Sequence, residues 1–449
     1  MGWEESGGPR DDSLQESRFA YPSWAGRHSK FEGHECLALL RLPRGKCGVE
    51  FSDKCASLEE CLKGDSVSVV SSPFGMLSPH IFLNNIIRGT VSNIINNYNI
   101  PSPSSPVLFL LDAECHPGSE GSAIFGEDGK ITGVLLPPLH KAEGYSTKLH
   151  VFASWRFVVG HVGAFFSSNP NSSQDRVERK HTKHSPSAVA RKSLVLVSVG
   201  GSWGSGVIID AKGYILTNAH LVLPFASLPT QKQKEEGSFS PKMQVPVRVR
   251  LDYPTPLSWY EAEVVYASSS HVDVALLHIT SKDLPALKSV LLPSPSAPKV
   301  SQRVFAAGHG IFGPSTRTLP TLTSGILSKI VSHNSQEVIY LSSAAIHAGN
   351  SGGALLDAQG AFLGLLTCNV TQSGGKVIPK INMSIPYSLL QPLFLYSSNP
   401  APNLLDKMER EDEQVRKLWK LESDFSDVKH EKRSTFERFA DKFKSNSKL

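Results

Sequence analysis

Short apolar runs, each bounded by turn residues, recur through the second half of this chain. Apolar or β-branched residues form such runs on both sides of a turn at 210–213, and again at 245–251, 274–279, 354–356 and 362–366. Runs of this length between glycine- or aspartate-containing turns predict buried strands and hairpins. We therefore expect an all-β domain over residues 193–396.

A second series of apolar runs, between residues 33 and 165, repeats part of this pattern. Four pairs of segments match at offsets between 231 and 237 residues: 36–42 with 273–279, 69–75 with 304–310, 89–95 with 325–331, and 117–125 with 348–356. Self-similarity at a nearly constant offset predicts a tandem duplication. The opening strands of the later copy have no counterpart in the earlier one. The first module is therefore either half a barrel completed by other contacts or a sequence without its true N-terminus.

Polar and charged segments flank these two copies. Residues 1–32 form a leader that is predicted to be disordered, and residues 166–192, rich in Ser, Asn and basic residues, form a predicted linker. Residues 397–449 are charged, but apolar side chains recur there at roughly helical spacing. We expect a helical tail that packs on the body of the protein.

A candidate nucleophile stands in the later copy. Ser351 lies between Gly349 and the pair Gly352-Gly353, directly before two apolar runs joined by a turn. Glycine allows the backbone N–H groups of Gly349 and Ser351 to converge on one point, where they would form an oxyanion hole. A serine hydroxyl also needs a base to take its proton.

A base and an orienting carboxylate precede this serine. His220 is predicted to end the second strand of the hairpin around 210–213, and Asp273 opens the apolar run 274–279. An aspartate there would hold the imidazole in one tautomer and stabilise the imidazolium. The order His220, Asp273, Ser351 predicts acyl-transfer chemistry that needs no cofactor and no metal ion.

These residues resemble the trypsin-like serine proteases, and most closely their HtrA-type branch. The similar segments are Thr-Asn-Ala-His at 217–220, Asp-Val-Ala-Leu-Leu at 273–277 and Gly-Asn-Ser-Gly-Gly at 349–353. The resemblance implies a chymotrypsin-like double β-barrel over residues 193–396 and a serine endopeptidase activity. Secreted trypsins have an aspartate where this chain has Asn350, so we expect a site that needs no freed amino terminus.

The same resemblance bears on specificity and on the first module. Ala345, six positions before the nucleophile, stands where a trypsin has an aspartate, so we expect a small or apolar residue before the scissile bond. In the first module, Cys36 and Glu120 stand at the aspartate and serine positions, and no histidine counterpart precedes them. Residues 33–165 are therefore predicted to be a degenerate, catalytically incomplete trypsin-like module.

The segment 349–353 also fits the G-x-S-x-G pattern of α/β-hydrolases. That elbow needs a helix directly after the serine and a histidine later in the chain. Here a predicted hairpin follows the serine, and the later histidine, His430, lies in the charged tail. The sequence therefore argues against a lipase or an esterase.

Composition narrows the class of protein further. The formal net charge is +5 over 449 residues, with much of the positive charge in the linker and tail, which gives no nucleic-acid signature. No run of 18 apolar residues occurs, so no membrane span is predicted. Of the six cysteines, Cys368 alone lies in the protease region, so no disulfide can form within it and a reducing or neutral compartment is expected.

The sequence ends in Ser447-Lys448-Leu449, a tripeptide that the peroxisomal import receptor reads at a free C-terminus. Together with one degenerate and one intact trypsin-like module, this ending resembles a family of proteases of the peroxisomal matrix. The resemblance implies protein substrates with cleavable targeting leaders, removal of those leaders from imported enzymes, and processing of β-oxidation enzymes in the matrix. It also implies self-association as a homodimer or a larger assembly.

Two other functions fit part of this sequence. An HtrA-type quality-control protease would use the same chemistry on unfolded chains, although no segment resembling a PDZ module follows residue 396. A pseudoprotease adaptor would bind proteins without cleaving them. Reaction of Ser351 with a fluorophosphonate would separate the adaptor from both proteases.

Overall fold

The structure is a computed structural model of the chain. It describes residues 61–74, 79–95, 108–140, 146–159, 185–253, 257–281, 283–287, 292–314, 317–371 and 377–421. The predicted leader at 1–32, Cys36 and the tripeptide at 447–449 lie outside the described residues.

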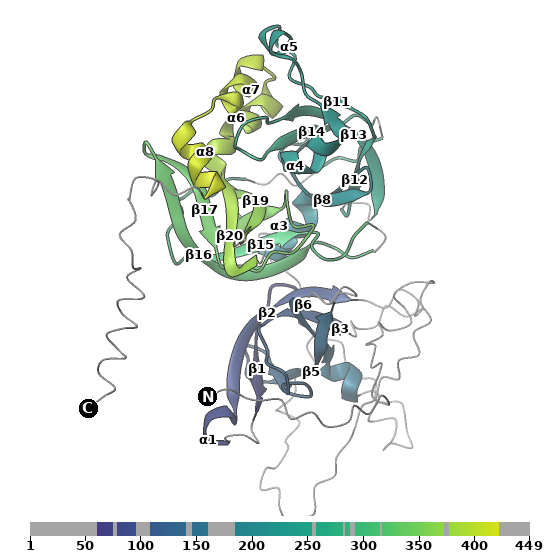
Figure 1. The fold of residues 1–449 in the computed structure, drawn as a ribbon. Helices are drawn as coiled ribbons and strands as arrows, with labels where there is room; N and C mark the ends of the chain where they lie inside the picture. The colour runs from purple at the N-terminus through teal and green to yellow at the C-terminus, as the bar shows by residue number, and fades with distance from the viewer. Residues whose placement is uncertain are drawn as a thin grey trace, which may run out of the picture.

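The described chain forms three closed barrels of six antiparallel strands each (Figure 1). The first barrel contains β1 (Ser66–Ser71), β2 (Asn85–Ile95), β3 (Leu108–Asp112), β4 (Ala123–Phe125), β5 (Ile131–His140) and β6 (Ser146–Ser154). The second contains β7 (Leu194–Val199), β8 (Ser202–Ile208), β9 (Tyr214–Thr217), β12 (Val247–Leu251), β13 (Ser258–Ala267) and β14 (Ala275–Ile279). The third contains β15 (Arg303–Gly308), β16 (Thr321–His333), β17 (Gln336–Ser342), β18 (Ala354–Asp357), β19 (Phe362–Thr371) and β20 (Val377–Pro386). The predicted all-β fold, a double barrel preceded by a partial copy, is confirmed.

Several strands are buried on both faces because the second and third barrels pack against each other. In β7, Val195 and Val197 point into the second barrel, whereas Leu194 joins a cluster between the barrels. The third barrel contributes Phe305 and Leu356 to that cluster. Full burial of each such side chain stabilises the fold by about 1.5–3 kcal/mol. The strands therefore have continuous apolar runs rather than a strict alternation.

The strand order of the first barrel, β1-β2-β3-β6-β5-β4, repeats the third-barrel order β15-β16-β17-β20-β19-β18. The described part of the first module is thus one complete barrel, which differs from the half barrel considered from the sequence. It corresponds to the third barrel, and residues 61–154 contain no counterpart of the second barrel among the described strands.

Strand pairing supports the duplication and corrects one of its alignments. Gly89 pairs with Val67 in the first barrel, and Gly325 pairs with Val304 in the third. The equivalent of Val304 is therefore Val67, and not Val69 as the aligned segments implied. A shift of two residues keeps the same face of a strand inward, so the apolar pattern alone could not detect it.

The turn before β4 retains the backbone geometry of the turn before β18. Gly118 and Gly121 have φ angles of +87° and +82°, and their counterparts Gly349 and Gly352 have +94° and +81°. Glu120 takes the place of the candidate nucleophile, and its Oε2 accepts a hydrogen bond from Gly118 N–H at 2.8 Å. The backbone N–H that corresponds to that of Gly349 is therefore bonded to a carboxylate in the first barrel.

The helices lie mostly around the second and third barrels. Helix α3 (Pro186–Ser193) occupies residues that the sequence assigned to the linker, and Ala190 anchors it in the core between the barrels. Between β9 and β12 lie α5 (Gln231–Glu235) and a small hairpin, β10 (Ala226–Ser227) with β11 (Lys242–Met243). Three further helices follow β20: α6 (Tyr387–Ser398), α7 (Pro402–Glu409) and α8 (Glu413–Lys420).

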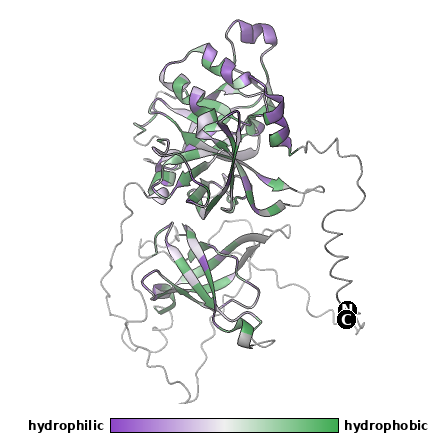
Figure 2. Ribbon diagram, turned by 90° about the vertical axis from the view of Figure 1, so that its left-hand side faces the viewer, coloured by the Kyte–Doolittle hydropathy of each residue, from purple (hydrophilic) through white to green (hydrophobic). Residues whose placement is uncertain are grey.

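The helices after residue 396 pack on the protein body, as expected for the tail. Helical ribbon coloured as hydrophilic stands out in Figure 2, whereas Leu405, Met408 and Val415 are buried. Glu409 of α7 accepts hydrogen bonds from the Tyr266 hydroxyl at 2.7 Å and from Ser269 N–H at 3.3 Å. These contacts fasten the tail to strand β13 and to the loop that follows it.

The first barrel contacts the third mainly through β2 and β16, which lie close together in Figure 1. The hydroxyls of Thr90 and Ser324 are 2.6 Å apart, and Asn93 Nδ2 donates to the Leu319 carbonyl at 2.9 Å. Asp112 Oδ2 accepts the N–H of Ser324 at 2.9 Å. The contact between the barrels therefore contains several buried or half-buried hydrogen bonds in addition to apolar packing.

Lys63 extends this contact from the start of the first barrel. Its Nζ donates to the Pro320 carbonyl at 2.6 Å, and the side chain is buried. Burial lowers the pKa of Lys63 to about 7, because the charged ammonium loses most of its hydration there. An amine that loses its charge this readily is tolerated at a buried interface.

The same interface makes the stability of the protein depend on pH through Asp112. Burial raises the pKa of Asp112 to about 6, although the hydrogen bond from Ser324 N–H lowers it. Because the folded-state pKa is raised, the stabilising contribution of this carboxyl is complete below its unfolded pKa and is lost as the pH rises through about 6. We expect Asp112→Asn to increase the free energy of unfolding by about 1–3 kcal/mol near pH 7.5, with little change near pH 4, as measured by denaturant titration.

A matched control is Asp128→Asn in the same barrel. The side chain of Asp128 is 45% exposed and caps a turn through Lys130 N–H, a bond that an asparagine can also accept. This variant should change the stability little at either pH. Equal effects of the two variants would contradict the assignment to the Asp112 site.

Candidate active site

The candidate nucleophile lies where the second and third barrels meet. Ser351 follows Gly349 in a glycine turn, defined here as residues 348–353, which leads directly into β18. The Ser351 carbonyl accepts the N–H of Ser205 in β8 at 2.8 Å. The Ser351 hydroxyl donates to the Thr367 carbonyl at 2.9 Å. The prediction of a serine on a tight turn before a hairpin is therefore correct.

The candidate base lies on a helix and not at a strand end. Strand β9 ends at Thr217, and His220 belongs to the one-turn helix α4 (Ala219–Val222) that follows. The prediction that His220 ends the strand is wrong by these three residues. Asn218, between β9 and α4, donates from Nδ2 to the Asp273 carbonyl at 2.7 Å. This bond ties the start of the helix to the residues just before β14.

The structure brings His220 and Asp273 together through two hydrogen bonds. His220 Nδ1 is 2.6 Å from Asp273 Oδ2, and the backbone N–H of His220 donates to Asp273 Oδ1 at 2.9 Å. Asp273 stands two residues before β14, at the mouth of this buried strand as the sequence predicts. With Nδ1–H bonded to the carboxylate, the lone pair of Nε2 is available to accept a proton.

The pKa values of the pair move in opposite directions. The hydrogen bond to Asp273 raises the pKa of His220 above its ordinary value, against the opposing effect of burial. Burial by itself would raise the pKa of Asp273, but the hydrogen bond and charge of His220 lower it overall. The carboxylate therefore stays ionised at neutral pH and stabilises the protonated imidazole.

Thr367, at a position that the sequence analysis did not single out, connects the aspartate to the serine. Its hydroxyl donates to Asp273 Oδ2 at 2.9 Å, and its carbonyl accepts the Ser351 hydroxyl. It directly follows the apolar run 362–366 within β19. Nothing in the local sequence separates this threonine from an ordinary strand residue, because its role depends on contacts with distant segments.

Within residues 349–353 of the glycine turn, two backbone N–H groups have no backbone acceptor in the described chain. The amides of Asn350, Gly352 and Gly353 donate to backbone carbonyls, whereas those of Gly349 and Ser351 have no backbone acceptor within the described chain. These are the two amides that the sequence nominated for an oxyanion hole. Their assignment to that role remains a prediction.

Ser205 and Trp203 hold the glycine turn from the side of the second barrel. The Ser205 hydroxyl donates to the Gly349 carbonyl at 2.7 Å and accepts His309 N–H at 2.8 Å. The Trp203 ring covers Gly349 so closely that a Cβ there would lie 1.9 Å from the ring. Only glycine fits at this position, both because of its positive φ angle and because of this contact.

Asn350 is buried beside this turn, at 1% exposure. Neither Oδ1 nor Nδ2 of its amide has a hydrogen-bond partner in the described part of the protein. A buried amide without partners costs about 1–3 kcal/mol. The surrounding contacts must therefore offset this cost to keep the turn in its present conformation.

The residue nominated for the specificity pocket is half-buried. Ala345 is fixed through its backbone, because its carbonyl accepts the Thr323 hydroxyl at 2.6 Å. A methyl group at this position brings no charge to pair with a basic substrate side chain. The geometry fits the expected preference for small or apolar residues, which remains a prediction.

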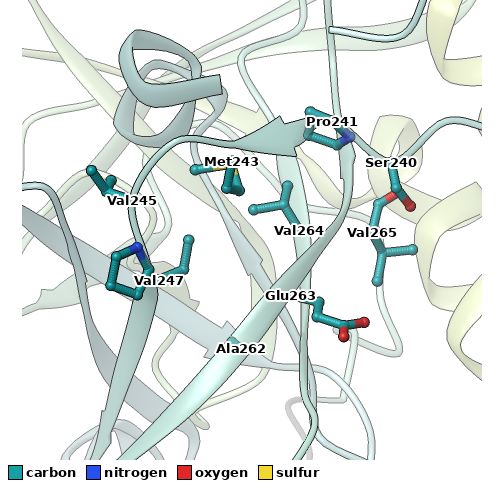
Figure 3. A pocket seen from close by; sticks show the side chains of 10 residues that line it. Ser240, Pro241, Met243, Val245, Val247, Ala262, Glu263, Val264 and Val265 are labelled. Atoms are coloured by element: carbon teal, nitrogen blue, oxygen red, sulfur yellow. The ribbon is translucent and has the colours of Figure 1, made fainter. Parts of the chain in front are cut away.

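A separate apolar groove of about 320 Å³ lies in the second barrel, between the β10–β11 hairpin and β13 (Figure 3). Met243, Val245 and Val264 line it, with Glu263 at one side. None of the nominated site residues lines it.

Among the described residues, no group of three His, Cys, Asp or Glu side chains is placed to hold a metal ion. No helix in the described ranges has the length and apolar character to cross a membrane.

The His220–Asp273 contact predicts a titration difference that can be measured without an assay of activity. We expect Asp273→Asn to lower the pKa of His220, because the raising effect of the carboxylate disappears while burial continues to favour the neutral ring. NMR titration of the His220 Cε1 proton would measure this change. Glu263→Gln, in the separate groove, is the control and should leave the His220 titration unchanged; an unaltered titration in Asp273→Asn would contradict the assignment.

Comparison with known proteins finds similarity to serine proteases. Residues 204–365 match the family model described as "Trypsin-like peptidase domain". The chain is 29% identical over 420 residues to the peroxisomal leader peptide-processing protease of Mus musculus, covering 88% of this chain and 67% of that protein. The identity to the Homo sapiens protein of the same name is 27%, with 96% of this chain and 72% of that protein covered.

Bacterial serine endoproteases match smaller shares of the chain. The periplasmic serine endoprotease DegP of Salmonella typhimurium is 32% identical over 196 residues, which covers 42% of this chain and 34% of that protein. A crystal structure of the serine endoprotease from Yersinia pestis aligns at 24% identity with a TM-score of 0.36, covering 51% of this chain and 68% of the other. This chain is a serine endopeptidase with a trypsin-like peptidase domain at residues 204–365, and its similarity to the peroxisomal leader peptide-processing proteases extends over most of its length.

Proposed function

We propose that this chain is a serine endopeptidase of the peroxisomal matrix that removes targeting leaders from imported enzymes and processes β-oxidation enzymes there. The observation that carries the proposal is the pairing of His220 with Asp273 beside the turn that bears Ser351. It occurs in a chain similar over most of its length to two leader peptide-processing proteases. Self-association and recognition by the peroxisomal import receptor belong to the same proposal.

In the proposed mechanism, the Ser351 hydroxyl turns from the Thr367 carbonyl toward His220. His220 Nε2 takes the hydroxyl proton while Ser351 Oγ attacks the peptide carbonyl carbon, and Asp273 stabilises the imidazolium. The amides of Gly349 and Ser351 bind the oxygen as it becomes negative. His220 then gives its proton to the leaving amine, and water hydrolyses the acyl-enzyme by the same route.

The position of the hydroxyl before reaction supports a substrate-dependent activation step. The carbonyl of Thr367, which Ser351 now uses, belongs to β19, and an extended peptide alongside this strand would compete for it. Binding of the substrate backbone would then release the hydroxyl for the base. Free enzyme would react less readily with small probes than enzyme that also holds a peptide.

The proposed activity is tested with a purified matrix enzyme that still carries its N-terminal leader. We expect the wild-type chain to cut it once, at the leader junction, and Ser351→Ala to leave it intact, because removal of the nucleophile costs on the order of 10⁶ in rate. Intact mass measurement gives the cleavage site and shows whether the residue before it is small or apolar. A fluorophosphonate should label the wild type alone.

Other outcomes would select the alternative functions. Cleavage of unfolded chains at many sites, with the leader left in place, would favour a quality-control protease. A silent probe and an intact substrate, with the same thermal unfolding for wild type and Ser351→Ala, would favour a pseudoprotease adaptor.

Localisation provides an independent test of the address at Ser447-Lys448-Leu449. A fluorescent protein fused to the N-terminal side of the full chain should colocalise with a peroxisomal matrix marker. Deletion of the tripeptide should make the signal diffuse, because receptor recognition requires this ending. Replacement of Asn446 by alanine, just outside the tripeptide, serves as the control; an unchanged punctate pattern after the deletion would contradict the assignment.

A further inference from the structure

A short loop at residues 309–313, which follows β15, contacts the glycine turn at several points. Ile311 N–H donates to the Ala348 carbonyl at 2.9 Å. His309 N–H donates to the Ser205 hydroxyl, which in turn donates to the Gly349 carbonyl. These bonds link the loop to the segment whose amides are nominated for the oxyanion hole.

The loop also packs closely against the side chains of this region. A Cβ on Gly310 would lie 2.2 Å from Asn350 Oδ1, and one on Gly313 would lie 3.1 Å from the Trp203 ring nitrogen. The glycine turn therefore cannot move far while the loop stays in place.

On its other side, the same loop packs against the first barrel. Ile311 and Phe312 lie against an apolar cluster of Leu110, Leu149 and Val151, which belong to β3 and β6. Alternation along β3 places Phe109 and Leu111 inside the first barrel and Leu110 on its outer face. The outer face of the first barrel is thus the surface that supports the loop.

The conformation of the loop and turn is strained. Ile311 has a φ angle of +70°, which is unfavourable for a β-branched residue, and the buried Asn350 amide has no partner in the described structure. Such features persist only where the surroundings hold them. Within the described chain, the apolar cluster on the first barrel contacts the strained residue itself and so contributes to holding it.

We infer that the first barrel is a positioning element for catalysis, which holds the 309–313 loop and through it the amides of Gly349 and Ser351 in the geometry that binds the oxyanion. The inference rests on the proposed function. It gives the first barrel a role that needs no nucleophile of its own, consistent with Glu120 at the former serine position. The residues that act through the loop, above all Leu110, are positioning residues.

The test compares two leucines that are neighbours on one strand. Leu110 and Leu111 are both fully buried in β3, but they face the loop cluster and the barrel interior respectively. In the full-length chain we expect Leu110→Ala to lower kcat for a leader-derived peptide by about tenfold, with KM within about twofold of wild type. The rate of phosphonylation of Ser351 by the fluorophosphonate should fall in parallel. Leu110→Met should keep most of the wild-type kcat and most of the wild-type phosphonylation rate.

The control variant Leu111→Ala should keep the wild-type kcat, although it lowers the thermal unfolding midpoint at least as much. If either leucine variant fails to fold, Val151→Ala and Val69→Ala provide a milder pair. Val151 lies in the cluster that contacts the loop, and Val69 lies in the barrel interior. Equal loss of kcat in both members of a pair, or no loss in either, would overturn this inference but leave the proposed function standing. A wild-type chain that neither cleaves peptide nor reacts with the probe would overturn the proposed function and the inference with it.

Discussion

The absence of side chains at Gly349 and Gly352 permits the close approach of the second and third barrels at the site. A Cβ on Gly352 would lie 2.1 Å from the Ser205 carbonyl oxygen, and one on Gly349 would lie 1.9 Å from the Trp203 ring. Because neither is present, Ser205 can bond to both Gly349 and Ser351 from the opposite barrel. The candidate nucleophile, its supporting turn and the candidate base are thereby held by two separate sheets that meet at one point.

The features that could be predicted from sequence are those encoded locally. Asp273 at the start of a buried run and Ser351 in a glycine turn are both visible within about ten residues, and the structure places them as expected. His220 was assigned to a strand end because the helix that bears it is a single turn, too short for an apolar period to appear. The positions of Thr367, Ser205 and Trp203 in the site cannot be predicted locally, because they arise from contacts across long separations in sequence.

A similar limit applies to the duplication. Its existence follows from self-similarity along the chain, but the sequence alignment places β1 two residues away from its true match with β15. A two-residue shift keeps the same side chains facing inward, so the apolar pattern cannot reveal it. The sequence also predicts that the first copy has no nucleophile, because Glu120 stands at that position. It could not show that the outer face of this copy supports a strained loop, because the apolar residues on that face match an ordinary buried strand.

The burial of the helices after residue 396 has a consequence for how the protease region holds together. Leu405 and Met408 belong to the same apolar cluster as Val272 and Val274, the two residues that flank Asp273. The compact folding unit of the protease therefore extends into the charged tail. A chain ended at residue 396 would expose an apolar surface directly behind the aspartate, where the loss of packing would loosen the very carboxylate that orients the histidine.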